Sequence, residues 1–168
     1  DYWAMYINEK YELPTDEREI IWDDGRNKEI GYKNKKSEGE KNYYVNKGDR
    51  SYMVYNKYKT MRTYGRQIIE VNRELKKIID EYIKDEGKED GDKLLNIGSS
   101  GVKQRLINIF KKQTGKSISV SMLRHIYITE KQDRGELNKT NERYLLSLRM
   151  AHSIVTQLKY YKEDEGDI

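Results

Sequence analysis

Four residues in the last third of the chain combine the side chains that transfer of a phosphoryl group to a phenol would require. Arg124 and His125 are adjacent, His152 follows, and Tyr161 comes nine residues after His152. An arginine presents a planar fork of donors that suits two nonbridging phosphate oxygens at once. A phenol ordinarily has a pKa of about 10, so a tyrosine nucleophile needs basic or cationic neighbours of this kind.

The order and spacing of these residues resemble the signature of the tyrosine recombinases. Members of that family carry a box H-x-x-R-H near the start of a helix, then a G-H-S or similar box, and then the nucleophilic tyrosine nine residues after the second histidine. This chain has Ser121-Met122-Leu123-Arg124-His125, Met150-Ala151-His152-Ser153 and Tyr160-Tyr161 in the same order. Each box alone is a weak signal, whereas the ordered set is more specific. The resemblance extends from about residue 42 to the C-terminus.

The resemblance implies a DNA recombinase or integrase that breaks and rejoins DNA through a 3′-phosphotyrosyl link, which a 5′-hydroxyl from another strand reverses. Tyr161 would be the nucleophile, Arg124 would hold the nonbridging oxygens, and His152 would donate to the phosphate or orient the phenol. Tyr160 is the alternative nucleophile, because neighbouring helical residues point about 100° apart and only one can face the phosphate. The nine-residue spacing favours Tyr161.

A lysine is implied as the acid that protonates the leaving 5′ oxygen, because the family carries one in a turn of its small sheet. Lys59 is the first candidate and Lys57 is the alternative, since the alignment of a basic turn is ambiguous by two residues. A positioned general acid contributes substantially to the rate of such a step. Either lysine could instead contact only the DNA backbone.

Two features depart from the family pattern. Ser121 stands where most members have histidine, so a hydroxyl would replace an imidazole at that phosphate contact. The first catalytic arginine of the family normally lies in an R-x-S-E-L-like helix ahead of the sheet, and Asp1-Tyr2 resembles the end of that motif. We therefore expect this arginine just before residue 1, in a longer protein that also carries an N-terminal DNA-clamping domain. A fragment that lacks the arginine and this domain should have impaired activity. Arg18 and Arg26 are poor replacements, because their surroundings are acidic and turn-rich.

Segregated charge favours a double-stranded DNA partner, although the net charge is only +4. Acidic residues gather at 16–24, 80–92 and 163–167, whereas 45–69 and 101–125 are strongly basic. A folded domain with this distribution has a positive face that attracts phosphate, and solvated loops of differing sign are the alternative interpretation. The expected DNA-contacting residues are Lys57, Arg62, Arg66, Lys103, Arg105, Lys111, Lys112, Lys116 and His125.

Composition excludes or disfavours several classes of site. The chain has no cysteine, which excludes disulfides, thiolate metal sites and a cysteine nucleophile. Two histidines without matched acids give little support for zinc, and we expect no metal and no cofactor. Thr114-Gly115-Lys116-Ser117 resembles the end of a nucleotide-binding loop, but Phe110 stands where the loop requires glycine, so we expect no nucleotide. No apolar run approaches membrane-spanning length, and we expect no membrane partner.

The elements that must position these residues begin with a small sheet. Asn42–Asn46 and Ser51–Asn56 flank a glycine turn and predict a hairpin, and Arg66–Val71 predicts a third strand. We expect an antiparallel sheet of three strands, with the basic stretch Lys57–Gly65 as a turn at its end. Apolar residues at helical spacing predict a short helix over Asp1–Asn8. The next segments are Glu19–Trp22, which predicts a strand, and 23–40, whose polar composition indicates a mobile surface excursion without function.

The remainder of the chain predicts helices. Apolar stripes mark 74–83 and 102–110, Ser119 can cap a helix through Tyr127, another helix begins at Asn141, and Ser153 can cap the last one. The predicted fold is α+β, a three-stranded antiparallel sheet followed by a mainly helical bundle, in a single catalytic domain over 1–168.

The resemblance also bears on assembly and on rival functions. Family members act as tetramers on paired DNA sites, and this Lys-, Asn- and Tyr-rich version is similar to integrases of large DNA viruses and related mobile elements. Such a protein would work wherever its target DNA lies, in the cytoplasm or nucleus of a host if viral. One rival is a type IB topoisomerase, which shares the catalytic fold, and the other is a non-catalytic DNA-binding domain.

Overall fold

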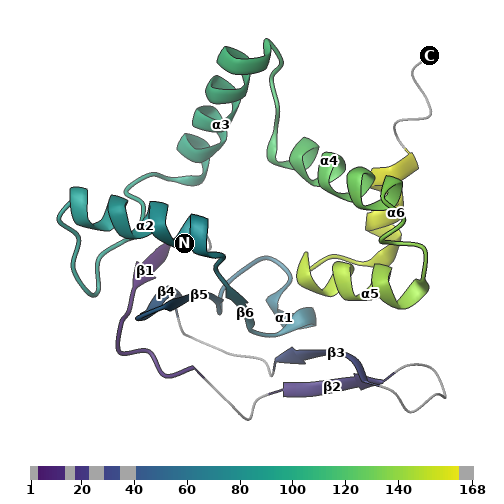
Figure 1. Cartoon of the computed structure of the whole chain (residues 1–168), viewed down its shortest axis with the longest axis horizontal. Helices are drawn as coiled ribbons and strands as arrows, with labels where there is room; N and C mark the ends of the chain where they lie inside the picture. Colours follow the sequence, from purple (N-terminus) through teal and green to yellow (C-terminus); the bar gives the residue numbers. More distant parts are fainter. Residues whose placement is uncertain (1–3, 14–17, 23–28, 35–40, 163–168) are drawn as a thin grey trace. The chain divides into compact units, whose positions relative to one another are not determined.

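A computed structural model describes residues 4–13, 18–22, 29–34 and 41–162 of the chain. The chain divides into two compact units, one of Asp1–Ile21 with Gly31–Asn96 and one of Trp22–Ile30 with Ile97–Ile168. The described elements in Figure 1 are β1 (Met5–Ile7), β2 (Arg18–Trp22), β3 (Glu29–Asn34), β4 (Asn42–Lys47), β5 (Arg50–Tyr55), α1 (Met61–Tyr64), β6 (Gln67–Glu70), α2 (Arg73–Asp85), α3 (Ser99–Thr114), α4 (Val120–Asp133), α5 (Thr140–Arg149) and α6 (Ile154–Lys162). The predicted α+β class is confirmed.

The first unit is built on a four-stranded mixed sheet in the order β1-β4-β5-β6. β4 and β5 form the predicted hairpin, with Tyr44 opposite Met53, and β6 pairs antiparallel with β5, with Ile68 opposite Val54. Gly48 in the hairpin turn has φ 75°, a conformation that glycine adopts without steric cost. The predictions of the hairpin and of a third antiparallel strand are therefore confirmed.

Strand β1 corrects two predictions. The described residues of the expected N-terminal helix contain a strand, and the sheet has four strands of mixed direction instead of three antiparallel ones. β1 runs parallel to β4, with Met5 beside Asn42. The backbone N–H of Ile7 donates to the carbonyl of Asp92, and that of Leu94 donates to the carbonyl of Met5, each over 2.8 Å. Partners so distant in sequence override a local apolar spacing that is typical of a helix.

A two-stranded sheet pairs β2 with β3. β2 confirms the strand predicted over Glu19–Trp22. β3 was not predicted, because residues 29–34, which belong to the segment 23–40 interpreted as a mobile surface excursion, form a strand. The rest of that predicted excursion lies outside the described residues.

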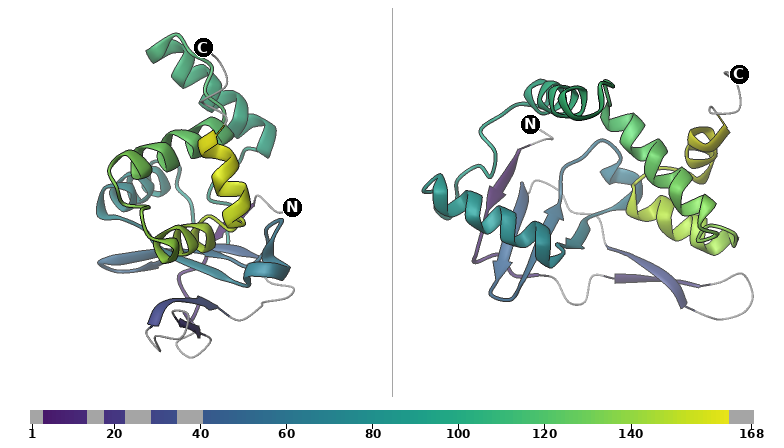
Figure 2. Two further views of the ribbon diagram at one scale, coloured as in Figure 1. Left: turned by 90° about the vertical axis from the view of Figure 1, so that its right-hand side faces the viewer. Right: turned by 45° about the horizontal axis from the view of Figure 1, so that its top comes forward.

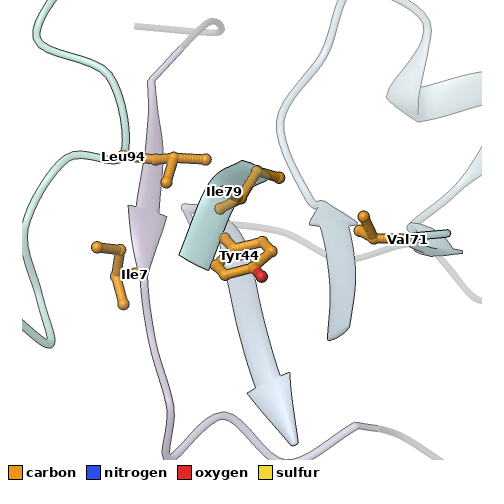
Figure 3. Close-up of a cluster of buried hydrophobic side chains, with 5 residues drawn as sticks. All are labelled: Ile7, Tyr44, Val71, Ile79 and Leu94. Carbon is orange, nitrogen blue, oxygen red and sulfur yellow. The ribbon is translucent and has the colours of Figure 1, made fainter. Parts of the chain in front are cut away.

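The core of the first unit lies between the sheet and α2, as Figure 3 shows. Its buried members are Ile7, Tyr44, Val71, Ile79 and Leu94, and Ile79 comes from α2. The Tyr44 hydroxyl donates to the Asp80 carboxylate of α2 over 3.0 Å, which ties the central strand to the helix. Burial is the main cause that raises the pKa of Tyr44 to about 12.

The second unit contains the four predicted helices α3 to α6, drawn from green to yellow in Figure 2. Ser119 caps α4, since its hydroxyl accepts from the Met122 N–H, and Ser153 caps α6 by accepting from the Thr156 N–H. Both predicted caps are therefore confirmed. Helix α6 packs along α4 and also contacts α5.

Contacts within the second unit bury a small core of Ile128, Leu137 and Leu146, with Met150 packed against it. Helix α3 contributes no buried residue. The side chains of this core come from α4, from α5 and its end, and from the connection between the two helices, whereas α3 keeps all of its side chains at least partly accessible.

Candidate functional site

The first two turns of α4 carry the predicted S-x-x-R-H box. Ser121 and Arg124 are exposed, and His125 is half-buried. Residues three apart in a helix lie on one face, so Ser121 and Arg124 share a face of α4. The hydroxyl cap from Ser119 fixes where the helix begins and hence which residues occupy this first exposed face.

His152 lies in the tight turn that joins α5 to α6. Its backbone N–H donates to the Ser147 carbonyl over 3.1 Å, and the N–H of Ala151 donates to the Leu148 carbonyl over 3.0 Å. The ring Nδ1 of His152 lies 3.1 Å from the Ser153 carbonyl, and because a carbonyl only accepts, this contact requires a hydrogen on Nδ1. The turn therefore fixes both the backbone and the ring of a half-buried His152.

Ala151 has φ 51°, and it is the one residue other than glycine with a positive φ in the part of the chain that the structure describes. A Cβ atom in this left-handed region costs about 1–2 kcal/mol. The hydrogen bonds of the surrounding turn must therefore hold Ala151 in this conformation. The conformation of Ala151 in turn sets the direction in which the chain continues through His152 into α6.

Tyr160 and Tyr161 both lie in the last turn of α6. Because α6 packs along α4, the helix that bears Arg124 and the helix that bears Tyr161 are neighbours within one unit. His152 lies in the turn that leads directly into α6. The second unit therefore contains three of the predicted site residues, on two helices that contact each other and on the turn that precedes one of them.

Lys57 and Lys59 belong to the first unit, in the connection from β5 to α1. Lys57 is half-buried and Lys59 is exposed. The Asn42 side chain binds both backbone polar groups of Lys57: its amide donates to the carbonyl over 2.9 Å, and its oxygen accepts from the N–H over 2.7 Å. Asn42 is 3% exposed, and no local sequence pattern marks it as a support of this connection.

The residues expected to contact DNA have different environments. Six are exposed cations, namely Arg62, Lys103, Arg105, Lys111, Lys112 and Lys116. On α3 the half-buried Val102, Leu106 and Phe110 form a stripe at four-residue spacing, and the cations lie on the rest of the helix surface. Arg66, by contrast, is 7% exposed and its Nε donates to the Asn56 side chain over 2.8 Å, so its guanidinium is engaged inside the unit.

The described residues contain no group of three histidine, cysteine or acidic side chains that could hold a metal ion. None of the described helices is both long enough and apolar enough to cross a membrane. No protein-family model, curated protein or solved structure matches this chain.

Proposed function

We propose that the chain is a DNA strand transferase of the tyrosine recombinase type. Tyr161 attacks the scissile phosphorus, the bond to the 5′ oxygen breaks, and the DNA is left joined to the enzyme by a 3′-phosphotyrosine. Arg124 and His152 stabilise the negative charge that develops on the nonbridging oxygens. A 5′-hydroxyl from another strand reverses the step, and the phosphotyrosine conserves the bond energy, so the reaction needs no cofactor.

The observation that carries the proposal is the packing of α4 along α6 within the second unit. Residues that must act on one phosphate have to lie close together, and contact between the helices that carry Arg124 and Tyr161 supports the proposal that they share a site. Arg124 is exposed, as a phosphate ligand should be. The order of the boxes and the nine residues from His152 to Tyr161 support the same assignment.

The backbone at Ala151 gives independent support. The G-H-S box of the recombinases has a glycine just before its histidine, and glycine tolerates positive φ. Ala151 occupies that place here and has φ 51° in spite of its Cβ atom. The turn thus keeps a glycine-like conformation at the position where the resemblance requires one.

Double-stranded DNA is the proposed substrate and partner. The exposed cations of α3, with Arg62 and Lys116, are available for phosphate contacts. A family-like assembly would be a tetramer on two DNA sites, with viral or other mobile DNA as the source of those sites. Ser121 shares a helical face with Arg124 and can offer its hydroxyl to the same phosphate.

A suicide-substrate assay tests the proposal. The intact protein is incubated with a broad pool of nicked duplexes, in which the cleaved 5′ strand diffuses away, and covalent adducts are resolved on a denaturing gel. We expect an adduct from the wild type and from Tyr160→Phe, and none from Tyr161→Phe. Tight, salt-sensitive DNA binding without any adduct would contradict strand transfer.

Two other functions have specific discriminators. A non-catalytic DNA-binding domain is favoured by the exposed basic surface of α3 and by Ser121 in place of histidine, and it predicts binding that Tyr161→Phe leaves unchanged with no covalent product. A type IB topoisomerase would use the same residues but would relax any supercoiled plasmid. Relaxation without a preferred site would favour that enzyme over a recombinase.

A further inference from the structure

Helix α3 has two sides of different chemistry. The half-buried Val102, Leu106 and Phe110 follow one another at four-residue spacing, so they lie along one side of the helix. At about 100° per residue, five exposed side chains share the opposite side. We call this set the α3 polar face, and its members are Gln104, Arg105, Asn108, Lys111 and Lys112.

The α3 polar face is positively charged. Its cations are Arg105, Lys111 and Lys112, and the sequence contains no acidic residue from position 93 to position 129 that would neutralise them from nearby in the chain. A cationic surface of this kind attracts the phosphate backbone of a nucleic acid. Charge complementarity therefore favours DNA as the partner of this face.

Two neutral residues distinguish the α3 polar face from a surface that binds only phosphate. Gln104 and Asn108 both carry a carboxamide, which offers donors and an acceptor, and they lie about one helical turn apart. The Gln104 Nε2 donates to the Asn108 Oδ1 over 2.9 Å. Because an amide nitrogen has two hydrogens, Gln104 retains its oxygen and one N–H for a ligand, and Asn108 fixes the plane in which they lie.

These residue types match the base edges in the major groove of DNA. The groove is about 12 Å wide and admits an α-helix, whose diameter with side chains is about 10–12 Å. Within it, arginine pairs with O6 and N7 of guanine, and glutamine pairs with N6 and N7 of adenine. Lysine contacts to phosphate position a protein on the duplex without reading its sequence. Lys111 and Lys112, in the last turn of α3, suit that positioning role.

We propose that α3 reads DNA sequence from the major groove, with Arg105 and Gln104 contacting base edges and the two lysines of the α3 polar face contacting phosphates. Asn108 is a positioning residue, because it binds the Gln104 amide. The proposal rests on the proposed function, since it takes double-stranded DNA as the partner. It adds the residues that choose the DNA site.

The test is a selection by the intact protein from duplexes with a randomised stretch of base pairs, followed by sequencing and competition titrations. The wild type should select a motif that contains a guanine and an adenine. Arg105→Ala should lose the preference for that guanine by about 5- to 150-fold, the range for one bidentate base contact, and keep the preference for the adenine. Gln104→Ala should show the converse pattern.

Two variants of the same helix are matched controls. Lys112→Ala removes the same unit of charge as Arg105→Ala, but it should weaken binding to all sequences equally, lower the salt slope by about one and leave the motif unchanged. Gln113→Ala alters the residue type found at position 104. Gln113 is exposed, and its place nine residues further along the helix puts it on the opposite side, so this variant should bind like the wild type.

Replacement of single atoms makes the test more specific. A guanine analogue with carbon in place of N7 should weaken binding of the wild type and leave the affinity of Arg105→Ala unchanged. Asn108→Ala should relax the preference for the same adenine that Gln104 reads. Adding Asn108→Ala to Gln104→Ala should cause no further loss of that preference, because Asn108 acts through Gln104.

The outcomes separate the reading role of α3 from strand transfer. A wild type without a motif, or a uniform loss of affinity from Arg105→Ala and Gln104→Ala with an unchanged motif, would overturn the reading role. Unchanged DNA affinity in every α3 variant would also overturn it and would assign the α3 polar face to another anionic partner. None of these results affects the covalent adduct on nicked DNA, and only the absence of that adduct from the wild type would overturn the proposed function itself.

Discussion

The two units of the chain position their candidate site residues by different physical means. In the first unit, the connection that carries Lys59 is held at its start by the Asn42 side chain of β4, which bonds to the backbone of Asn56 and Lys57. In the second unit, Arg124 and His152 are placed by a helix cap at Ser119 and by a tight turn before α6. Long-range buried bonds therefore hold the candidate segment of the first unit, and local backbone geometry holds the candidate residues of the second.

Two arginines make this contrast concrete. Arg124 is exposed at the start of α4, whereas Arg66 is 7% exposed and donates to Asn56. An exposed arginine contributes little to stability and is free to serve a ligand, while a buried one stabilises the fold around it. Substitutions at the two positions should therefore separate rate from stability.

Arg124→Ala should have the largest effect on rate. Loss of the donor fork from the phosphate should lower the rate of covalent adduct formation by about 10²- to 10³-fold, the usual effect of removing one donor to a developing oxyanion. The urea midpoint should stay unchanged, because the side chain is exposed. Arg134→Ala is the control, since this exposed arginine lies ten residues and about 15 Å further along the same helix axis. Equal rates for Arg124→Ala and wild type would remove Arg124 from the site.

Arg66→Met should have the largest effect on stability. Loss of the bond from Nε to the Asn56 oxygen leaves a buried acceptor without this donor, so the free energy of unfolding should fall by about 1–3 kcal/mol. The loss of free energy of unfolding is measured by urea denaturation and by the exchange of amide hydrogens in β4 and β5. The control is Arg62→Ala, at an exposed position of α1, which should change the free energy of unfolding by less than about 0.5 kcal/mol. A stable Arg66→Met protein that has lost DNA affinity would show that Arg66 contacts phosphate instead.

A shift in pH should weaken the first unit through Tyr44. Burial, as the main cause, raises the pKa of Tyr44 to about 12, above the ordinary 10 of an unfolded tyrosine. The folded state therefore keeps a proton that the unfolded state loses, and the resulting stability is present below pH 10 and disappears as the pH rises to about 12. Linkage gives a loss of about 2 kcal/mol, and Tyr44→Phe should lack this component. Parallel urea titrations at pH 9 and pH 11.5 measure it, and identical pH slopes for the two proteins would refute the assignment.

Ala151→Gly should have the smallest effect and the opposite sign. Removal of the Cβ atom at φ 51° relieves backbone strain, and the gain is partly offset by the greater freedom of glycine in the unfolded chain, so the second unit should gain up to about 1 kcal/mol. Gly135→Ala, at φ 72° in the same unit, should lose about 1 kcal/mol. Thermal unfolding of both variants tests the pair, and a destabilised Ala151→Gly would show that the turn is not strained.

Local features of the sequence predicted much of the second unit. Ser119 and Ser153 mark the starts of α4 and α6 because a hydroxyl satisfies the first N–H groups of the helix that follows it. In the first unit, the hairpin turn at Gly48 was also predicted from a local signal, since its φ of 75° suits glycine. These signals depend only on nearby residues, and the structure confirms them.

The features that the sequence did not predict depend on distant partners. The apolar residues of 1–8 have a helix-like spacing as a set, but Met5 and Ile7 lie in a strand that bonds to β4 and to the 91–94 segment. Arg66 lies in a basic stretch that resembles a phosphate-binding turn, and only the folded position of Asn56 explains its burial. The positive φ of Ala151 likewise has no marker in its own residue type. Contacts between residues that are far apart in the sequence leave no pattern in the residues near either partner.

The central claim is that Tyr161 becomes covalently joined to DNA, and the most direct measurement locates that bond. The adduct trapped on a nicked duplex is digested with nuclease and trypsin, and the peptide spanning Tyr160 to Lys162 is fragmented in a mass spectrometer. We predict that the nucleotide phosphate is attached to Tyr161. Attachment to Tyr160 or to any other residue, or an unmodified peptide from a protein that binds DNA tightly, would contradict the account.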